Sequence, residues 1–362
     1  MLPGLGNFTI LDPHDVKGED AGNNFFLSAD SIGQNRGEVA ARLLLEMNHD
    51  VRGESRQETV DQVLASEPDF FSRFQLVVAC DLSEKTVATV SSVCWQANIP
   101  LMLLRSAGFL GYIRLQLKEH VVVEAHPDNQ APDLRLDQAW PALHEWLDNQ
   151  ALAMDTMSLK DHGHTPYPVL VFRALQEWRQ GHSSPPGNYR EKRELKEKIL
   201  AAMRKREGNE EVFEDEENFE EAGRAVNTVV APTVVPSATR EILDDPAAET
   251  ISASSSSFWV LAHALREFVA REGRLPVSGV IPDMFSDSER FIQLQNIYRE
   301  KAGQDVEQVG RKVSQVLESL GRSTETIQEA EVRRFCKESR HLRVQRGSRV
   351  AEEFTTPGTG DW

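Results

Sequence analysis

The sequence contains little cysteine and no long apolar run. Its three cysteines, Cys80, Cys94 and Cys336, are too few and too widely spaced for a disulfide framework or a zinc pattern. No apolar run approaches the roughly 18 residues of a membrane-spanning helix, and no basic segment followed by an apolar core opens the chain. We therefore expect a protein of a reducing compartment, in the cytoplasm and the nucleus.

Positive charge is also scarce. The 362 residues include 40 Lys and Arg against 57 Asp and Glu, which gives a formal net charge of −17. Because phosphate neutralisation needs clustered Lys and Arg, nucleic acids and anionic membranes are excluded as main partners. The acidic stretch Glu214–Glu221, within the acidic region 207–221, is typical of a solvated surface or hinge, and steering of a basic modifier or partner is the alternative.

The motifs of common catalytic classes are missing as well. The sequence contains no Gly-x-Ser-x-Gly, no His-Glu-x-x-His and no phosphate loop. Each cysteine is expected to be a small buried hydrophobe rather than a nucleophile. His162 and His164 have no further metal ligands nearby in the sequence. We expect them to be hydrogen-bonded at a surface or an interface.

The first ~125 residues alternate strand and helix patterns, which indicates a parallel sheet covered by helices. Apolar strands are predicted at Phe8–Leu11, Gln75–Cys80 and Ile99–Leu104. Ser31-Ile-Gly-Gln34 predicts a capping box before the first long helix, and Ser83 predicts the cap of the next. The fold class that follows is α/β, a partial doubly wound, nucleotide-binding-type sheet followed by an all-α domain.

From His126 onward the pattern becomes helical. We predict a nucleotide-binding-type domain at residues 1–127, an all-α domain at 128–354 and a tail at 355–362. In the second domain we expect a helix opened by Pro166 and Pro168, a charged helix at Asn188–Arg206 and a helix after Ser257 that Gly273 ends. Two separate helices are expected after these, one from about Ser288 and one over Val306–Leu320. Loops are expected at Glu207–Asp215 and Val229–Ser257.

The opening residues are typical of the second strand of a nucleotide-binding sheet, with Asp12 at the strand's end. No first strand and no glycine-rich turn precede it, although a βαβ nucleotide site is built from that turn. In the usual order 3-2-1-4-5, the first strand lies between Phe8–Leu11 and Gln75–Cys80. Without it, both strands have unpaired backbone groups. We therefore expect an incomplete gene model or a fragment.

Three long, irregular stretches carry a family resemblance: Leu2–Leu27, Lys118–Asp128 (KEHVVVEAHPD) and Glu214–Ala222 (EDEENFEEA). They resemble the regulatory, amyloid-precursor-binding-type subunits of the heterodimeric neddylation-activating enzyme, in the ubiquitin-activating-enzyme family. The resemblance extends from Leu2 to about Phe354. It implies a Rossmann-like adenylation-type domain and a helical domain related to the catalytic-cysteine domain, without the cysteine. It also implies that the family's N-terminal segment and its C-terminal return into the sheet are missing.

The resemblance implies that the other subunit of the heterodimer carries the chemistry. The ribose-binding acid corresponds to Asp12, but Asn23 stands where the catalytic subunit has a phosphate-binding arginine. Arg36 replaces a lysine, and Leu82 replaces a metal-binding carboxylate. Arg and Lys differ in donor geometry, and Asn cannot offset triphosphate charge. We expect no catalytic, cofactor or metal site in this chain, with ATP and magnesium used by the partner subunit.

The resemblance also implies partners: the catalytic subunit, the ubiquitin-like modifier of cullins and, from the family's name, amyloid precursor protein. Exposed Met284 and Phe285 beside charged residues would suit a hydrophobic contact with a polar rim, and ordinary core packing is the alternative. The residues predicted to bind the catalytic subunit are His164, Asp283, Met284, Phe285, Arg290, Phe291, Leu294 and Asn296.

The leading hypothesis is a non-catalytic subunit that scaffolds the catalytic one. A truncated interaction adaptor without an activating role is the first alternative. A stand-alone adenylating enzyme is the second, supported only by Asp12. An NAD-dependent dehydrogenase is least favoured, because the glycine fingerprint is missing.

Overall fold

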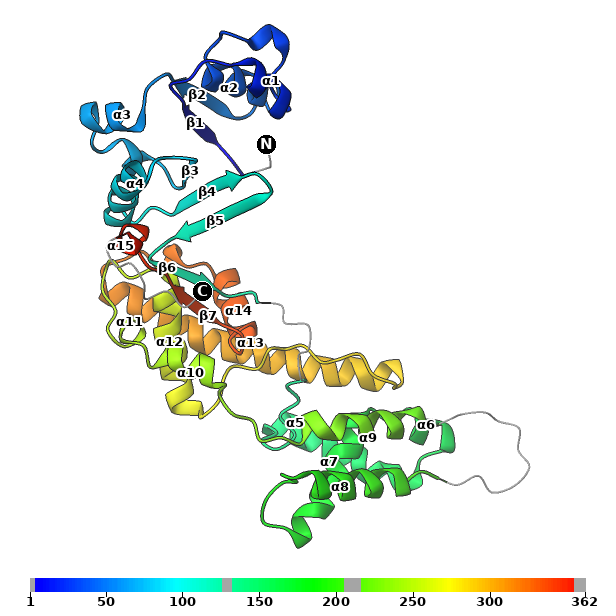
Figure 1. Cartoon of the computed structure of the whole chain (residues 1–362). Helices are drawn as coiled ribbons and strands as arrows, with labels where there is room; N and C mark the ends of the chain where they lie inside the picture. Colours follow the sequence, from blue (N-terminus) through cyan, green and yellow to red (C-terminus); the bar gives the residue numbers. More distant parts are fainter. Residues whose placement is uncertain (1–3, 126–131, 205–215, 355–362) are drawn as a thin grey trace. The chain divides into compact units, whose positions relative to one another are not determined.

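The computed structural model describes residues 4–125, 132–204 and 216–354. The chain forms two compact units, unit 1 (Met1–His120 with Gln345–Trp362) and unit 2 (Val121–Val344). It passes between them twice, in β6 (Glu119–Val122) and β7 (Arg343–Arg346), which pair with each other (Figure 1). None of the described helices is long and apolar enough to cross a membrane.

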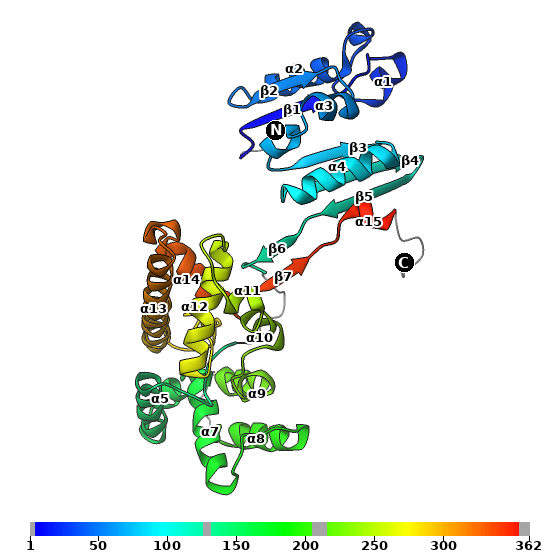
Figure 2. The same ribbon diagram turned by 90° about the vertical axis from the view of Figure 1, so that its left-hand side faces the viewer.

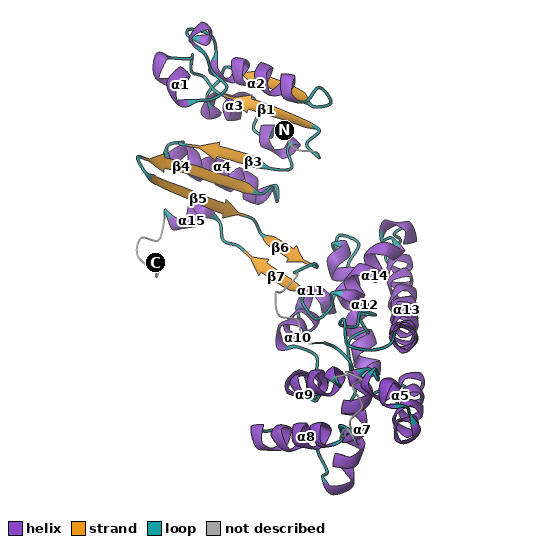
Figure 3. Cartoon of the chain, turned by 90° about the vertical axis from the view of Figure 1, so that its right-hand side faces the viewer, coloured by secondary structure: helices purple, strands orange, loops and turns teal. Residues whose placement is uncertain are grey.

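Unit 1 is the α/β part of the molecule, and Figure 3 shows its strands flanked by helices. Its main elements are β1 (Asn7–Leu11), α1 (Gly18–Asn23), α2 (Arg36–Met47), β2 (Arg52–Arg56), α3 (Val60–Ser66), β3 (Val77–Cys80), α4 (Glu84–Gln96), β4 (Leu101–Ala107), β5 (Leu110–Gln116) and α15 (Val350–Glu353). Ser83 caps α4 as predicted, because its hydroxyl accepts the N–H of Thr86. The capping prediction for Ser31 was wrong. Gly33 takes a positive φ of 87°, and the cap of α2 is Asn35, which accepts the N–H of Glu38.

The strands of unit 1 form two separate small sheets. β1 pairs in parallel with β2, while β3 pairs in parallel with β4, which continues antiparallel to β5. Among the described residues no strand pairs β1 with β3. These are the two strands between which the first strand of a doubly wound sheet was expected to lie.

After the helical part the chain returns to unit 1 in the short helix α15, which packs against α4. Val350 of α15 is buried in the core of β3, β4 and α4. Its N–H and the Ser91 hydroxyl both donate to the amide oxygen of buried Gln116, at 2.9 and 2.6 Å, and the Ala351 N–H donates to Ser91. The helical domain was predicted to end at residue 354, whereas the helical unit of the structure, unit 2, ends at Val344.

Unit 2 is helical apart from its share of β6 and β7 (Figures 2 and 3). Its helices are α5 (Pro141–Ala153), α6 (Leu159–Gly163), α7 (Tyr167–Gly181), α8 (Tyr189–Ala201), α9 (Glu217–Val229), α10 (Ser237–Leu243), α11 (Pro246–Glu249), α12 (Ser257–Glu272), α13 (Ser288–Ser319) and α14 (Glu329–Lys337). α12 ends at Gly273 in the left-handed conformation, with φ of 70°, as predicted. The predicted loop Glu207–Asp215 and the tail 355–362 lie outside the described residues.

Two predictions for unit 2 were wrong. The separate helices expected from about Ser288 and over Val306–Leu320 are one helix of 32 residues, because no proline or positive φ interrupts it. The expected loop Val229–Ser257 contains α10 and α11. Pro236 is the N-cap of α10 and Pro246 is in the first turn of α11, so these prolines start helices instead of marking a loop.

Buried polar residues connect distant segments of unit 2. Arg135, 2% exposed, forms a bidentate ion pair with Asp133 at 2.8 and 2.7 Å. The same guanidinium donates to the carbonyls of Leu275 and Pro276. Asp133 also pairs with Arg340 at 3.0 Å. This cluster fixes the segment before α5 against the turn after α12.

Candidate functional site

Asp12 follows β1 directly, at the carboxyl end of a parallel strand, where doubly wound folds place their ligands. Its side chain is 17% exposed, and one oxygen lies 2.6 Å from the Arg36 Nε. The other oxygen accepts the backbone N–H of His14 at 3.0 Å and lies 3.0 Å from the His14 ring Nδ1. The chain's own donors therefore occupy both oxygens of this carboxylate.

Arg36 binds a second acid in addition to Asp12. Its NH1 donates to Asp20 of α1 at 2.9 Å, and Asp20 also accepts the N–H of Lys17. Burial acts to raise the pKa of Asp12, but the hydrogen bonds from Arg36 and His14 outweigh it and lower the pKa below its ordinary value. The Lys17 N–H and then Arg36 lower the pKa of Asp20. Asp12, Arg36 and Asp20 form a closed clamp of charges, called the Asp12 clamp below.

Asn35 positions the Asp12 clamp. It is 8% exposed, caps α2, and its side-chain amide donates to the carbonyls of Asp12 and His14 at 3.0 and 3.1 Å. Arg36 is therefore held at the first turn of α2, beside the end of β1. Neither Asn35 nor Asp20 was predicted as a site residue. An Asn directly before a helical pattern was the available signal.

Asn23 and Leu82, the other two positions at which the resemblance implies a replaced residue, lie outside this clamp. Asn23 is exposed at the end of α1, and Leu82 is half-buried against the core of β3, β4 and α4. The nearby Asp81 has a positive φ of 49°, and its carboxylate accepts the N–H of Ser106 at 3.2 Å. Within the described ranges, no group of three or more His, Cys, Asp or Glu could hold a metal ion.

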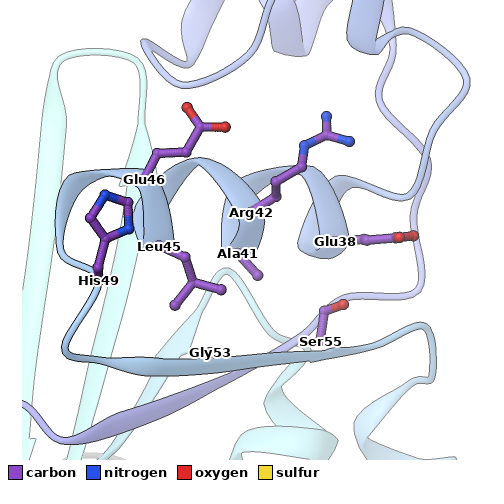
Figure 4. Close-up of a pocket in the computed structure, with 8 residues that line it drawn as sticks. All are labelled: Glu38, Ala41, Arg42, Leu45, Glu46, His49, Gly53 and Ser55. Atoms are coloured by element: carbon purple, nitrogen blue, oxygen red, sulfur yellow. The ribbon is translucent and has the colours of Figure 1, made fainter.

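A hollow of about 350 Å³ lies between α2 and β2, and none of the clamp residues lines it. Figure 4 shows Leu45 pointing toward the strand at Gly53, while Arg42 and Glu46 point away from it. Gly53 is required there, because a Cβ would lie 2.4 Å from the ring of Phe8 on β1. The hollow is lined by Glu38, Ala41, Arg42, Leu45, Glu46, His49, Gly53 and Ser55.

The predicted partner-binding residues divide into an exposed and a buried group. Phe285 is 37% exposed and stacks on His164, with ring centroids 5.2 Å apart. The Asp287 N–H donates to the carbonyl of His164, and Arg290 donates to the carbonyl of Asp161 and to Asp287. α6 and the start of α13 thus form one surface carrying the His164–Phe285 pair.

Two of the remaining predicted residues are exposed and three pack inward. Asp283 and Asn296 are exposed. The expectation of an exposed Met284 was wrong, because Met284 is 9% exposed and belongs to the core of α5, α7 and α9. Leu294 is fully buried in the same core, and Phe291 packs against it. Met284, Phe291 and Leu294 therefore pack as ordinary core residues, which was the alternative to a partner contact.

The cysteines and histidines also differ in part from expectation. Cys94 and Cys336 are buried as predicted, and burial raises their pKa to about 11 and about 12. Cys80 is exposed at the end of β3, which was not expected. His162 is buried, not at a surface, and its Nδ1 lies 2.5 Å from the equally buried carboxylate of Glu216.

The first 138 residues match the ThiF family. Unit 1 is therefore a nucleotide-binding-type domain of the ThiF class, which confirms the predicted fold class. Over nearly its whole length the chain is similar to regulatory subunits. It is 46% identical over 358 residues, 98% of this chain and 66% of the relative, to the NEDD8-activating enzyme E1 regulatory subunit of Danio rerio. It is 36% identical over 362 residues, 99% of this chain and 67% of the relative, to the NEDD8-activating enzyme E1 regulatory subunit AXL of Arabidopsis thaliana.

The chain belongs to the family of NEDD8-activating enzyme E1 regulatory subunits, as the sequence resemblance indicated. It spans slightly less than two thirds of the length of the Danio rerio relative. Among solved structures, a crystal structure of E. coli MccB with succinimide matches with a TM-score of 0.29 and 19% identity, covering 32% of this chain and 34% of MccB.

Proposed function

We propose that this protein is the non-catalytic regulatory subunit of a heterodimeric enzyme that activates NEDD8, the ubiquitin-like modifier of cullins. In this proposal a separate catalytic subunit binds ATP and magnesium, adenylates the modifier and carries the thioester cysteine. The protein scaffolds that subunit in the cytoplasm and nucleus. The names of its relatives and its membership of their family support this role.

One observation carries the non-catalytic part of the proposal. The carboxylate at the ribose-binding position, Asp12, is bonded by Arg36 and His14 of the chain itself. A ribose hydroxyl would have to compete with a charge-assisted hydrogen bond of 2.6 Å at one oxygen and with the His14 N–H at the other. Asn23 and Leu82 supply neither the cation nor the carboxylate that phosphate and magnesium require. A nucleotide would therefore find no complete set of ligands at this strand end.

For the contact with the catalytic subunit we propose the surface around His164 and Phe285. A half-exposed aromatic pair surrounded by Asp283, Asp287 and Arg290 suits the apolar centre and polar rim of a protein interface. The modifier and amyloid precursor protein are further proposed partners.

ATP–pyrophosphate exchange tests the proposal. The purified chain, the catalytic subunit and their mixture are assayed with the modifier, and thioester formation is followed on non-reducing gels. We expect exchange and thioester only in the mixture. Exchange by the chain alone would establish the stand-alone enzyme. A stable complex in which added chain leaves the catalytic subunit's exchange and thioester formation unchanged would favour the interaction adaptor.

A further inference from the structure

A groove between α8 and α9 presents an aromatic ring and three cations on one face. Figure 2 shows the two helices side by side in unit 2. Tyr189, Lys192, Arg193 and Lys196 follow the i, i+3, i+4, i+7 spacing of a single helical face. Together with residues of α9 they enclose a groove of about 290 Å³. The lining residues are Tyr189, Lys192, Arg193, Lys196, Glu197, Leu200, Gly223, Val226 and Asn227.

Tyr189 is an exposed aromatic side chain on a fixed backbone. It is 81% exposed, whereas Tyr167 and Tyr298 of the same unit are 2% and 0% exposed. Asn188 caps α8 by accepting the N–H of Glu191, and Glu191 bonds back to the N–H of Asn188, so the first turn that carries Tyr189 is held in place. Exposed tyrosines on rigid elements are enriched in protein interfaces, because the ring gives a large contact area at little entropic cost.

Lys192 donates to the carbonyl of Asn227 at 3.2 Å, whereas the other two cations of the groove have a weak ion-pair partner or none among the described residues. Arg193 pairs with Glu197, but both side chains are about two-thirds exposed, at 66% and 62%, so solvent weakens this pair. The ammonium of Lys196 has no ion-pair partner in the described part of the chain. Its stem lies over Gly223, where a Cβ would approach the Lys196 Cε to 3.3 Å. The glycine therefore lets Lys196 lie flat along the groove.

The charge of the groove is opposite to that of the chain. Three cations and one acid line it, in a protein with a net charge of −17. A long polyanion such as nucleic acid would meet the repulsion of the whole chain, whereas a short acidic segment would meet only the local positive charge. The shape favours an extended or helical peptide, since the groove runs along α8 for about three turns from Tyr189 to Leu200.

We propose that the α8–α9 groove is a docking site for an acidic peptide segment of a partner protein. Its carboxylates would bind Arg193 and Lys196, and an apolar side chain would pack on Tyr189. The observations behind this site are independent of the proposed function, because none of its residues belongs to the Asp12 clamp or to the His164–Phe285 surface.

The test uses the full chain and a fluorescein-labelled acidic peptide of alternating Glu and Leu, with binding followed by anisotropy at low and high salt. One variant is Arg193→Gln with Lys196→Gln. The matched control is Arg190→Gln with Lys198→Gln, which removes two cations of the same helix outside the groove lining. Each double variant also breaks one exposed i,i+4 pair, Arg193–Glu197 or Lys198–Glu194. Circular dichroism melting verifies that both fold.

We expect the groove variant to weaken peptide binding about tenfold at low salt, because it removes two partly screened charge pairs. The control should weaken binding less than about twofold. Tyr189→Ala should weaken binding several-fold at both salt concentrations, because its contact is apolar. Equal losses in the groove variant and the control would overturn the proposal, since general charge would then explain binding. Tighter binding of a single-stranded oligonucleotide than of the peptide would also overturn it.

Discussion

Each unit of this protein contains an aspartate bonded to an arginine, and the two pairs differ in their surroundings. In unit 2, the side chains of Asp133 and Arg135 are 9% and 1% exposed, and Arg135 also donates to two backbone carbonyls. In unit 1, Asp12 and Arg36 are 17% and 35% exposed at the open end of a strand. The first pair connects segments far apart in the sequence. The second occupies a position where related folds bind a ligand.

This difference shows that an ion pair has to be judged by what surrounds it. A buried pair with every hydrogen bond satisfied is expensive to break, because removing one partner leaves an unpaired buried charge. A half-exposed pair exchanges part of its bonding with water and costs less. The Asp12 clamp therefore contributes modestly to stability, and its main consequence is that each oxygen of the carboxylate already accepts a hydrogen bond from the chain itself.

The largest expected effect comes from Arg135→Ala. The substitution leaves buried Asp133 with one cation and the carbonyls of Leu275 and Pro276 without this donor, so unit 2 should lose about 3–5 kcal/mol of unfolding free energy. Hydrogen exchange of unit 2 peptides measures the loss. Arg340→Ala, which removes the more exposed partner of Asp133, is the control and should cost under about 1 kcal/mol. Equal losses would mean that burial does not distinguish the two arginines.

A smaller effect is expected from Arg36→Gln. It removes the cation shared by Asp12 and Asp20, and after allowance for solvent the cost should be about 1–2 kcal/mol, confined to unit 1. Hydrogen exchange of peptides from β1 and α2 provides the measurement. Arg42→Gln, an exposed arginine of the same helix, should be near neutral. A loss as large as that of Arg135→Ala would contradict the comparison between the two pairs.

The clamp also predicts a pH dependence. Asp12 and Asp20 have pKa values below their ordinary 3.8 in the folded protein. Their contribution to the free energy of unfolding is therefore fully present above pH 3.8. It is lost as the pH falls through the lower folded-state pKa values. The stability difference between the native chain and Arg36→Gln should therefore shrink below about pH 4 in denaturant unfolding. A difference that stays constant with pH, as expected for Arg42→Gln, would show that the clamp is not ionic.

Much of the fold could be predicted because local chemistry determines it. Ser83 and Gly273 were predicted as caps from side-chain and backbone preferences, and the alternation of strands and helices gave the fold class. The missed features depend on choices between local signals. Ser31 and Asn35 are both good caps, but Ser31 ends a 3-10 helix and a turn with a positive φ at Gly33 separates it from α2, so Asn35 is the cap. Pro236 and Pro246 are compatible with a loop or with a helix start.

The candidate site was less predictable because its contacts join residues distant in sequence. Asp12 and Arg36 were singled out separately, but their distance of 2.6 Å depends on how Asn35 fixes the start of α2. Met284 and Phe285 are adjacent and both apolar, so both were predicted to be exposed. Only the packing of the loop before α13 buries Met284 and leaves Phe285 beside His164.

The smallest expected effect on folding belongs to Phe285→Ala, which removes a half-exposed ring and should change the unfolding free energy by under about 1 kcal/mol. Its effect on the proposed interface should be larger. A ring at the centre of an interface contributes about 2 kcal/mol or more, so affinity for the purified catalytic subunit should fall by at least about tenfold in biolayer interferometry. Phe109→Ala, which truncates an exposed aromatic of unit 1, is the control and should leave this affinity unchanged. If both variants bind the catalytic subunit normally, the His164–Phe285 surface is not the contact, and the stacked pair serves only to hold α6 against the start of α13.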